Sequence, residues 1–200
     1  MRFRSSLLLI AMLSLSMPLA AIPITFVANL DGPSESPPNA SPATGFAIVT
    51  IDSNAHTMRV IVDFADLVAG NTAAHIHVIN GPGDANLVDT LGPVATTTPT
   101  FTGFPTGGAA GSYDNTFDMT LASSYRAGWI TDSGGTTALA EVELFDGIVE
   151  GRAYLNIHSS TFPGGEIRGF LVETPEPGTI GMFCLGMAGL IGGAVRRART

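Results

Sequence analysis

Three of the four histidines in this 200-residue chain are spaced so that their imidazoles could bind one metal ion. His75 and His77 are two residues apart in an alternating segment, and such residues point to the same face of a β-strand, roughly 6.6–6.8 Å apart. His158 ends a second alternating segment, where it shares a face with Tyr154 and Asn156. If the two strands are near neighbours, the three imidazoles converge into a ligand set suited to zinc or copper.

The same histidines could instead form a structural cluster held by hydrogen bonds, without a metal. Glu35 and Glu166 are candidate carboxylate partners for the imidazoles, and Asn156 lies on the His158 face. Arg168 shares a strand face with Glu166, so the two could form an ion pair that orients an imidazole or simply pair with each other. Both interpretations stay open on the sequence alone.

No residue set for a catalytic reaction accompanies the histidines. No serine has the G-x-S-x-G context of a hydrolase nucleophile. The only cysteine is Cys184, near the C-terminus, so thiol catalysis, disulfides and cysteine-based metal sites are excluded from the body of the chain. We therefore predict a non-enzymatic protein, with a zinc or copper metalloprotein of redox or hydrolytic activity as the alternative.

The histidines would be positioned by short antiparallel strands. Alternating apolar and polar residues separated by Gly- and Pro-rich turns predict seven strands. Their ranges are 24–30, 45–52, 58–64, 73–79, 117–121, 152–158 and 166–172. Residues 91–112 are expected to form a long surface loop, and 137–146 either one helix ending at Gly147 or two short strands. This pattern predicts an all-β, antiparallel sandwich or barrel over residues 22–173.

The charge of this body excludes one class of partner. The chain has nine arginines and no lysine, and five of the arginines lie near its two ends. Residues 22–175 keep four arginines against sixteen carboxylates, a formal net charge of −12. Such an acidic surface repels phosphate backbones, so nucleic-acid binding is excluded.

The N-terminus has the pattern of a secretory signal peptide, which we place at residues 1–21. Arg2 and Arg4 precede a short apolar run at 7–15, and the small residues Ala20 and Ala21 follow. The apolar run is about half the ~20 residues that a membrane span requires. We therefore expect export, with cleavage by signal peptidase.

The C-terminal segment, residues 174–200, has three parts in a distinctive order. Pro175-Glu176-Pro177 comes first, then an uncharged apolar stretch at 178–195, and then an arginine cluster. The stretch is long enough to cross a bilayer as a helix, and the arginines after it predict a cytoplasmic end. The arginines are Arg196, Arg197 and Arg199.

This order resembles the PEP-CTERM sorting signal of Gram-negative bacteria. The resemblance implies recognition and cleavage by an exosortase, a membrane cysteine protease, and an association with exopolysaccharide. It predicts a precursor anchored in the inner membrane, followed by a cell-surface or extracellular-matrix location.

The body resembles the CHRD (chordin-type) domain from about Phe26 to Val172. The resemblance rests on the motifs TAAHIH at 72–77, GRAYLNIH at 151–158 and PGGEIRG at 163–169, with ESPP at 35–38 and TG at 44–45. It implies an immunoglobulin-like or superoxide-dismutase-like Greek-key β-sandwich. It implies no settled activity, because animal members bind growth factors and bacterial members have no established biochemical role.

Copper–zinc superoxide dismutases also place an H-x-H motif on a strand. This chain lacks their fuller set of metal histidines and their paired cysteines, and only His56, in a predicted turn after Asn54, remains outside the two histidine motifs. Dismutase activity is therefore not predicted.

Overall fold

One antiparallel β-sheet forms the body of the protein. The structure, a computed structural model, describes residues 22–84 and 91–174. The order of strands across the sheet is β4-β6-β7-β1-β2-β3-β5, and β8 pairs with β1. The strands are β1 (Ile24–Asp31), β2 (Thr44–Asp52), β3 (Thr57–Ala65), β4 (Asn71–Val78), β5 (Gly111–Asp118), β6 (Ala153–Ser159), β7 (Ile167–Phe170) and β8 (Val172–Glu173). The prediction of an all-β, antiparallel fold is confirmed.

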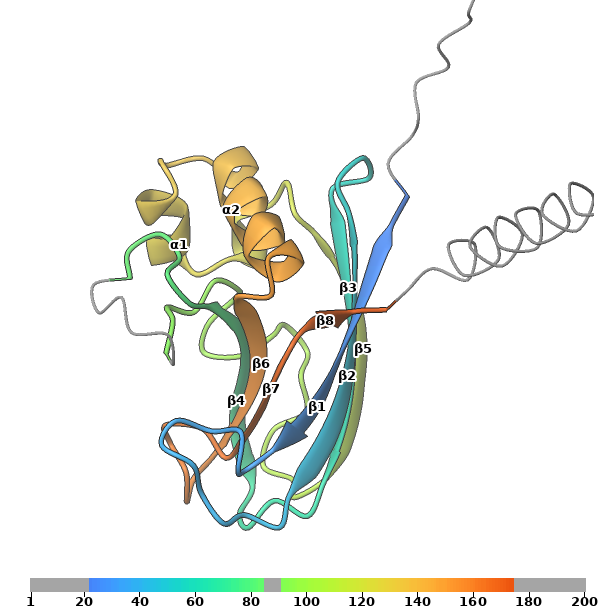
Figure 1. Cartoon of the computed structure of the whole chain (residues 1–200), viewed down its shortest axis with the longest axis vertical. Coiled ribbons are helices and arrows are strands. Elements are labelled where there is room, and N and C mark those ends of the chain that lie inside the picture. Colours follow the sequence, from blue (N-terminus) through green and yellow to red (C-terminus); the bar gives the residue numbers. More distant parts are fainter. Residues whose placement is uncertain (1–21, 85–90, 175–200) are drawn as a thin grey trace, which may run out of the picture.

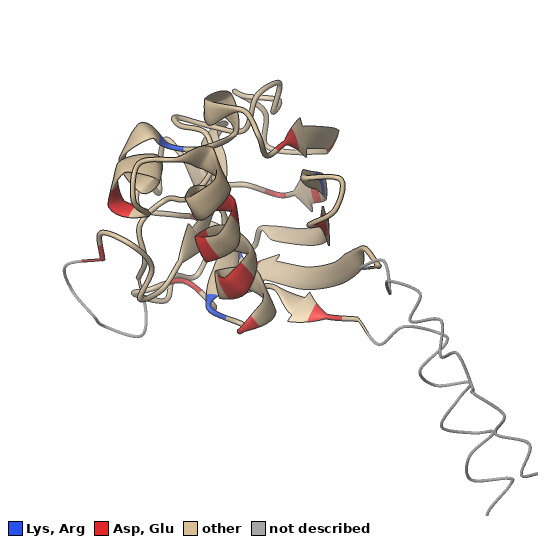
Figure 2. Cartoon of the chain, turned by 90° about the horizontal axis from the view of Figure 1, so that it is seen from above, with Lys and Arg blue, Asp and Glu red and all other residues tan. Residues whose placement is uncertain are grey.

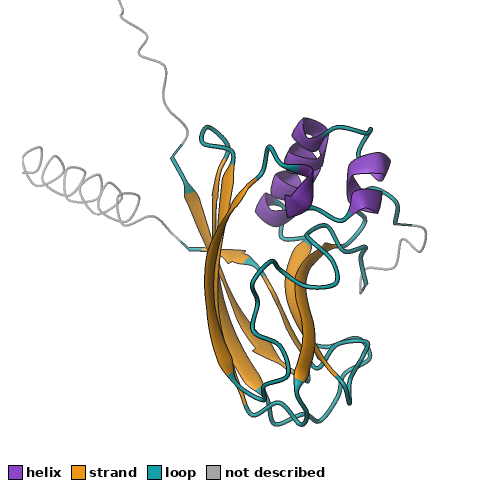
Figure 3. Ribbon diagram, turned by 180° about the vertical axis from the view of Figure 1, so that it is seen from behind, coloured by secondary structure: helices purple, strands orange, loops and turns teal. Residues whose placement is uncertain are grey.

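The sheet curls until its two halves face each other, so one sheet supplies both layers (Figure 1). β1 and β2 pair along their whole lengths, whereas β1 and β7 are in register only at Asp31 and Arg168. This limited pairing marks the boundary between the β4-β6-β7 half and the β1-β2-β3-β5 half. Figure 3 shows the same arrangement from behind, with the halves enclosing a common interior.

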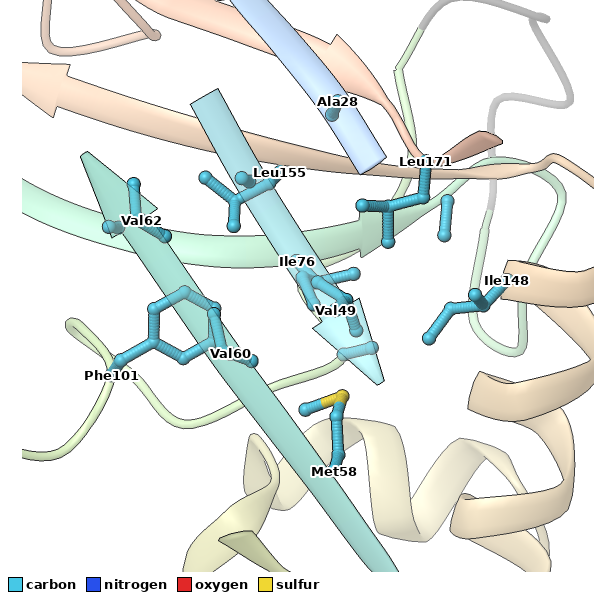
Figure 4. Close-up of a cluster of buried hydrophobic side chains, with 14 of the residues drawn as sticks. Ala28, Val49, Met58, Val60, Val62, Ile76, Phe101, Ile148, Leu155 and Leu171 are labelled. Carbon is cyan, nitrogen blue, oxygen red and sulfur yellow. The ribbon is translucent and has the colours of Figure 1, made fainter. Parts of the chain in front are cut away.

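The interior is filled by the apolar residues of the alternating pattern. Val60 and Val62 on β3 are fully buried and point toward Ile76 of β4 and Leu155 of β6, which come from the opposite half (Figure 4). Because side chains alternate between faces, the residues that alternate with these core residues along each strand lie on the outer face of each half. The histidines of β4 and β6 therefore lie outside the apolar core.

Two helices cover one end of the interior (Figure 3). They are α1 (Ala127–Asp132) and α2 (Thr137–Val149), preceded by a 3-10 turn at Ala122–Ser124. The Thr136 hydroxyl caps α2 by accepting a hydrogen bond from the Leu139 backbone N–H at 3.3 Å. Trp129 of α1 is fully buried and donates from Nε1 to the Ala140 carbonyl at 3.0 Å, which ties the helices together.

Several details differ from the sequence-based expectations, and the strand predicted at 166–172 is divided into β7 and β8. The helix expected at 137–146 is present, but it continues past Gly147 to Val149, and α1 was not predicted. β5 begins at Gly111, inside the range predicted as a loop, and ends at Asp118 rather than 121. The β5 residues that face the core are Tyr113 and Phe117, so its apolar alternation is sparse.

The segments predicted for export and sorting lie outside the described residues. They are the signal peptide at 1–21, the apolar helix at 178–195, and the residues Pro175, Glu176, Pro177, Arg196, Arg197 and Arg199. Within the part that the structure describes, no helix has the length and apolar character needed to cross a membrane.

Carboxylates lie along α2 and at strand and loop ends, with few basic residues among them (Figure 2).

Candidate metal centre

His75 and His77 lie side by side on the outer face of β4. Ala74, Ile76 and Val78 alternate with them and are fully buried in the core, as the two-residue period predicts. The two imidazole centroids are 4.7 Å apart.

His158 reaches the same place from β6, which pairs with β4. In this antiparallel register Asn156 is opposite His75, so His158 lies diagonally across from it. The His158 ring centroid is 4.6 Å from that of His75 and 6.2 Å from that of His77. One ring nitrogen from each of the three residues lies within 4.8 Å of the others. The structure thus brings together the three histidines that the sequence singled out.

Two backbone carbonyls fix the orientation of the rings. His77 Nδ1 is 2.7 Å from the Gly92 carbonyl, and His158 Nδ1 is 3.0 Å from the Pro163 carbonyl. A carbonyl only accepts hydrogen bonds, so each Nδ1 carries the proton and each Nε2 keeps its lone pair. Carbonyls that orient metal-binding histidines in this way are typical of metal sites.

The free nitrogens face one another. His75 Nε2 is 2.9 Å from His158 Nε2. His75 Nδ1 and His77 Nε2 are buried and make no hydrogen bond of good geometry. A buried polar group without a partner costs about 1–3 kcal/mol, so a purely structural cluster would leave this cost uncompensated. A metal ion bound by the Nε2 lone pair would remove this cost at His77.

The imidazoles are held in the neutral form that a metal ion requires. Burial lowers the pKa of His75 to about 3, helped by His77 and His158 and opposed by the Pro99 carbonyl. Burial also lowers the pKa of His77 to about 4, against the hydrogen bond to Gly92. The pKa of His158 is lowered by burial too. Neutral imidazole is the ligand form, so the ligands are ready at neutral pH.

An aromatic and a cationic group cover one side of His77. The Tyr154 ring stacks on the His77 ring at 4.8 Å between centroids and an interplanar angle of 4°. The Arg168 guanidinium lies over the Tyr154 ring, 4.8 Å from its centroid. The Tyr154 hydroxyl also accepts a long hydrogen bond, 3.4 Å, from the Gly92 N–H. Gly92 therefore anchors both members of the stack.

Glu35 and Glu166, the carboxylates considered as partners for the imidazoles, bind other groups. Glu166 is fully buried and accepts from the Ser41 hydroxyl and from the Val68 N–H, both at 2.7 Å. Glu35 Oε2 lies 3.8 Å from Arg168 Nε, so Arg168 forms an ion pair with Glu35. Burial raises the pKa of Glu35 to about 7, opposed by Arg168 and by the Ser36 backbone.

Asn156 lies between the histidines and Glu35. It is opposite His75 on β4 and opposite Arg168 on β7, and it is almost fully buried. A Cβ on Gly165 would lie 2.6 Å from Glu35 Oε1 and 2.8 Å from Asn156 Oδ1. The loop that contains Pro163 can pack here only because position 165 has no side chain.

The fourth histidine lies elsewhere. His56 has a positive φ of 53° in the turn between β2 and β3, and its Nδ1 is 2.9 Å from Glu141 Oε2 on α2. It contributes nothing to the cluster and is therefore a matched control for the other three.

Sequence reasoning missed the groups that complete the site. The carbonyls of Gly92 and Pro163 are backbone atoms of loops, and residue types carry no signal for them. The stack of Arg168 on Tyr154 depends on the pairing of β6 with β7. The GG pair at 164–165 belongs to the PGGEIRG motif, but its role as a packing position appears only in three dimensions.

The part of the chain that forms this antiparallel sheet and carries the histidine cluster matches the model of a known family. Residues 26–171 match the CHRD domain, which is most of the chain, and the protein belongs to the CHRD domain family. Residues 173–198 match the PEP-CTERM protein-sorting motif. No curated protein and no solved structure matches the chain. The protein is therefore an exported CHRD-domain protein that is processed by an exosortase and sorted to the cell surface.

Proposed function

We propose that this exported protein is a non-enzymatic metal-binding protein that holds one zinc or copper ion through His75, His77 and His158. The observation that carries the proposal is the pair of oriented rings. Gly92 and Pro163 hold the Nδ1 protons of His77 and His158, which leaves both Nε2 lone pairs available, and one ring nitrogen from each of the three histidines lies within 4.8 Å of the others. Three neutral imidazoles at this spacing can close around an ion with N–metal bonds of ~2.0–2.1 Å after small side-chain shifts.

Binding is favoured over catalysis by what surrounds the cluster. Among residues 22–84 and 91–174, no carboxylate joins the three histidines, so no general base of that kind is placed beside the ion. The groups stacked on His77 are a tyrosine ring and, beyond it, a guanidinium. Glu35 and Glu166, the nearest candidates in the sequence motifs, are engaged with Arg168, Ser41 and Val68.

The proposal extends to the location of the metal-binding body. The precursor is anchored in the inner membrane through residues 178–195, and signal peptidase removes residues 1–21. Exosortase cleavage near Pro175-Glu176-Pro177 then releases the acidic body into the cell-surface or extracellular matrix, where exopolysaccharide is the expected neighbour. The matched sorting motif supports this route.

Metal loading of the full-length chain tests the proposal. The chain, purified in detergent and stripped of metal, is equilibrated separately with Zn(II) and with Cu(I), freed of excess ion and analysed by mass spectrometry. We expect about one ion per chain for at least one of the two metals. His158→Gln should abolish this loading, whereas His56→Gln should retain it.

Circular dichroism of each variant establishes that it is folded before its metal content is compared. Wild-type protein that binds neither ion would overturn the proposal. So would equal loading of wild type and a folded His158→Gln variant, because the ion would then be bound elsewhere.

A further inference from the structure

The geometry points to a cluster that selects Cu(I) over Zn(II). This inference rests on the proposed function and goes beyond it by naming the ion that His75, His77 and His158 prefer.

The ligand set carries no negative charge. Within the described residues the cluster consists of three histidines and no Asp, Glu or Cys. A Zn(II) ion bound there keeps both positive charges, whereas Cu(I) keeps one. Burial of an uncompensated charge is costly, and the cost grows with the charge. His75 is only 7% exposed, so water compensates little of the charge of a bound ion.

Arg168 adds positive charge on one side of the cluster. Its guanidinium is 4.8 Å from the Tyr154 centroid, and the Tyr154 ring is in turn 4.8 Å from the His77 ring. The cation is thus one aromatic ring away from a metal ligand. Glu35, its ion-pair partner at 3.8 Å, is not a member of the cluster.

Arg126 adds a second cation through the neighbouring segment. Its Nε donates to the Val94 carbonyl at 2.9 Å, and Val94 forms a β-bridge with His77. Asp132 lies 3.7 Å from the Arg126 guanidinium and is likewise outside the cluster. Each arginine repels a divalent ion about twice as strongly as a monovalent one.

The number of protein ligands favours the same ion. Zinc sites in proteins are almost always four-coordinate, and a site with three protein ligands completes its shell with water or substrate. Cu(I) accepts three-coordinate, trigonal ligation, which three imidazoles complete without another group. The oriented lone pairs of His77 and His158, together with His75, supply that number.

Competition with chromogenic chelators measures the selectivity on the full-length chain in detergent. Bicinchoninate reports Cu(I) under anaerobic, reducing conditions, and 4-(2-pyridylazo)resorcinol reports Zn(II). We expect Cu(I) to bind tighter than Zn(II) by a factor on the order of a hundred, from the extra unit of charge facing two guanidinium groups. Arg126→Gln should narrow this ratio by roughly tenfold by strengthening Zn(II) binding.

A matched charge variant controls for the change in net charge. Arg59 is exposed and pairs with Asp114 between β3 and β5, so Arg59→Gln should leave the ratio unchanged. Equal affinities for the two ions, or tighter Zn(II) binding, would overturn the selectivity while leaving the metal site intact. An unchanged ratio in a folded Arg126→Gln variant would overturn the role of the arginine. Absence of binding to either ion would instead contradict the proposed function itself.

Discussion

The Nε2 atoms of His75 and His158 lie 2.9 Å apart although 83 positions separate the residues in the chain. Two nitrogen lone pairs at this distance repel each other unless a proton or a metal ion lies between them. The Pro163 carbonyl keeps the His158 proton on Nδ1, so in the metal-free protein the bridging proton must come from His75. His75 Nδ1 is buried and makes no hydrogen bond of good geometry. In the proposed metal-bound form, the ion takes the place of that proton.

Metal binding should stabilise the folded protein. An ion that binds only the folded state at a hundredfold excess over its dissociation constant adds about 2.7 kcal/mol, or a rise in Tm of roughly 5–10 °C. Differential scanning calorimetry with and without Cu(I) or Zn(II) measures this shift. We expect it to vanish in His158→Gln and to persist in His56→Gln. Equal shifts in both variants would place the ion outside the cluster.

The glycine behind the Pro163 loop should matter for metal affinity. Gly165 has a φ of 133°, and a Cβ there would collide with Glu35 Oε1. Gly165→Ala should move the loop and the carbonyl that orients His158, lowering metal affinity by about tenfold to a hundredfold. Gly164→Ala is the control, because a Cβ at that position meets nothing within 4 Å. Chelator competition compares the two, and similar affinities would show that the loop does not orient the ligand.

Glu35 should make stability depend on pH in a defined direction. Burial raises its pKa from 4.5 to about 7, so the folded protein binds more protons here than the unfolded chain. The contribution of Glu35 to stability is therefore fully present below pH 4.5 and is lost as the pH rises through 7. Glu35→Gln, which stays neutral, should equal wild type in acid and exceed it by about 2–3 kcal/mol near pH 8. Urea unfolding curves that run parallel at both pH values would refute this assignment.

Much of the fold follows from local patterns, and the exceptions have physical causes. The alternation in β3 and β6 is strict, and both strands were predicted nearly to the residue. Gly147 predicts a helix end by its type, yet α2 continues through it. A Cβ at Gly147 would lie 2.4 Å from Val78 Cγ1, so the glycine allows the helix to approach β4 closely. The sequence pattern does not distinguish these two uses of glycine.

The histidine cluster could be predicted only in part. The spacing of His75 and His77 places both on one face, because side chains alternate along a strand. The approach of His158 depends on the pairing of β4 with β6, which are separated by two helices and β5. Their pairing is a property of the tertiary fold. The carbonyls that set the tautomers belong to loops, and they become visible only once the loops are placed.

The sorting route makes its own prediction. Glu176→Ala should block exosortase processing, so that the C-terminal tail stays on the protein and the protein stays with the membrane fraction. Immunoblotting with an epitope placed after Arg199 follows the tail. Glu173→Ala, a nearby exposed carboxylate on β8, should be processed normally. Equal loss of the tail in wild type and Glu176→Ala would contradict the dependence on this motif.

Anomalous diffraction from crystals loaded with the preferred ion tests the metal site most directly. We expect one strong peak at the absorption edge of that metal, within ~2.0–2.1 Å of a ring nitrogen of each of His75, His77 and His158. The Nδ1 atoms of His77 and His158 should remain hydrogen-bonded to Gly92 and Pro163. A metal-loaded crystal without a peak among these three rings, or with its peak elsewhere on the protein, would rule out the histidine cluster as the metal site.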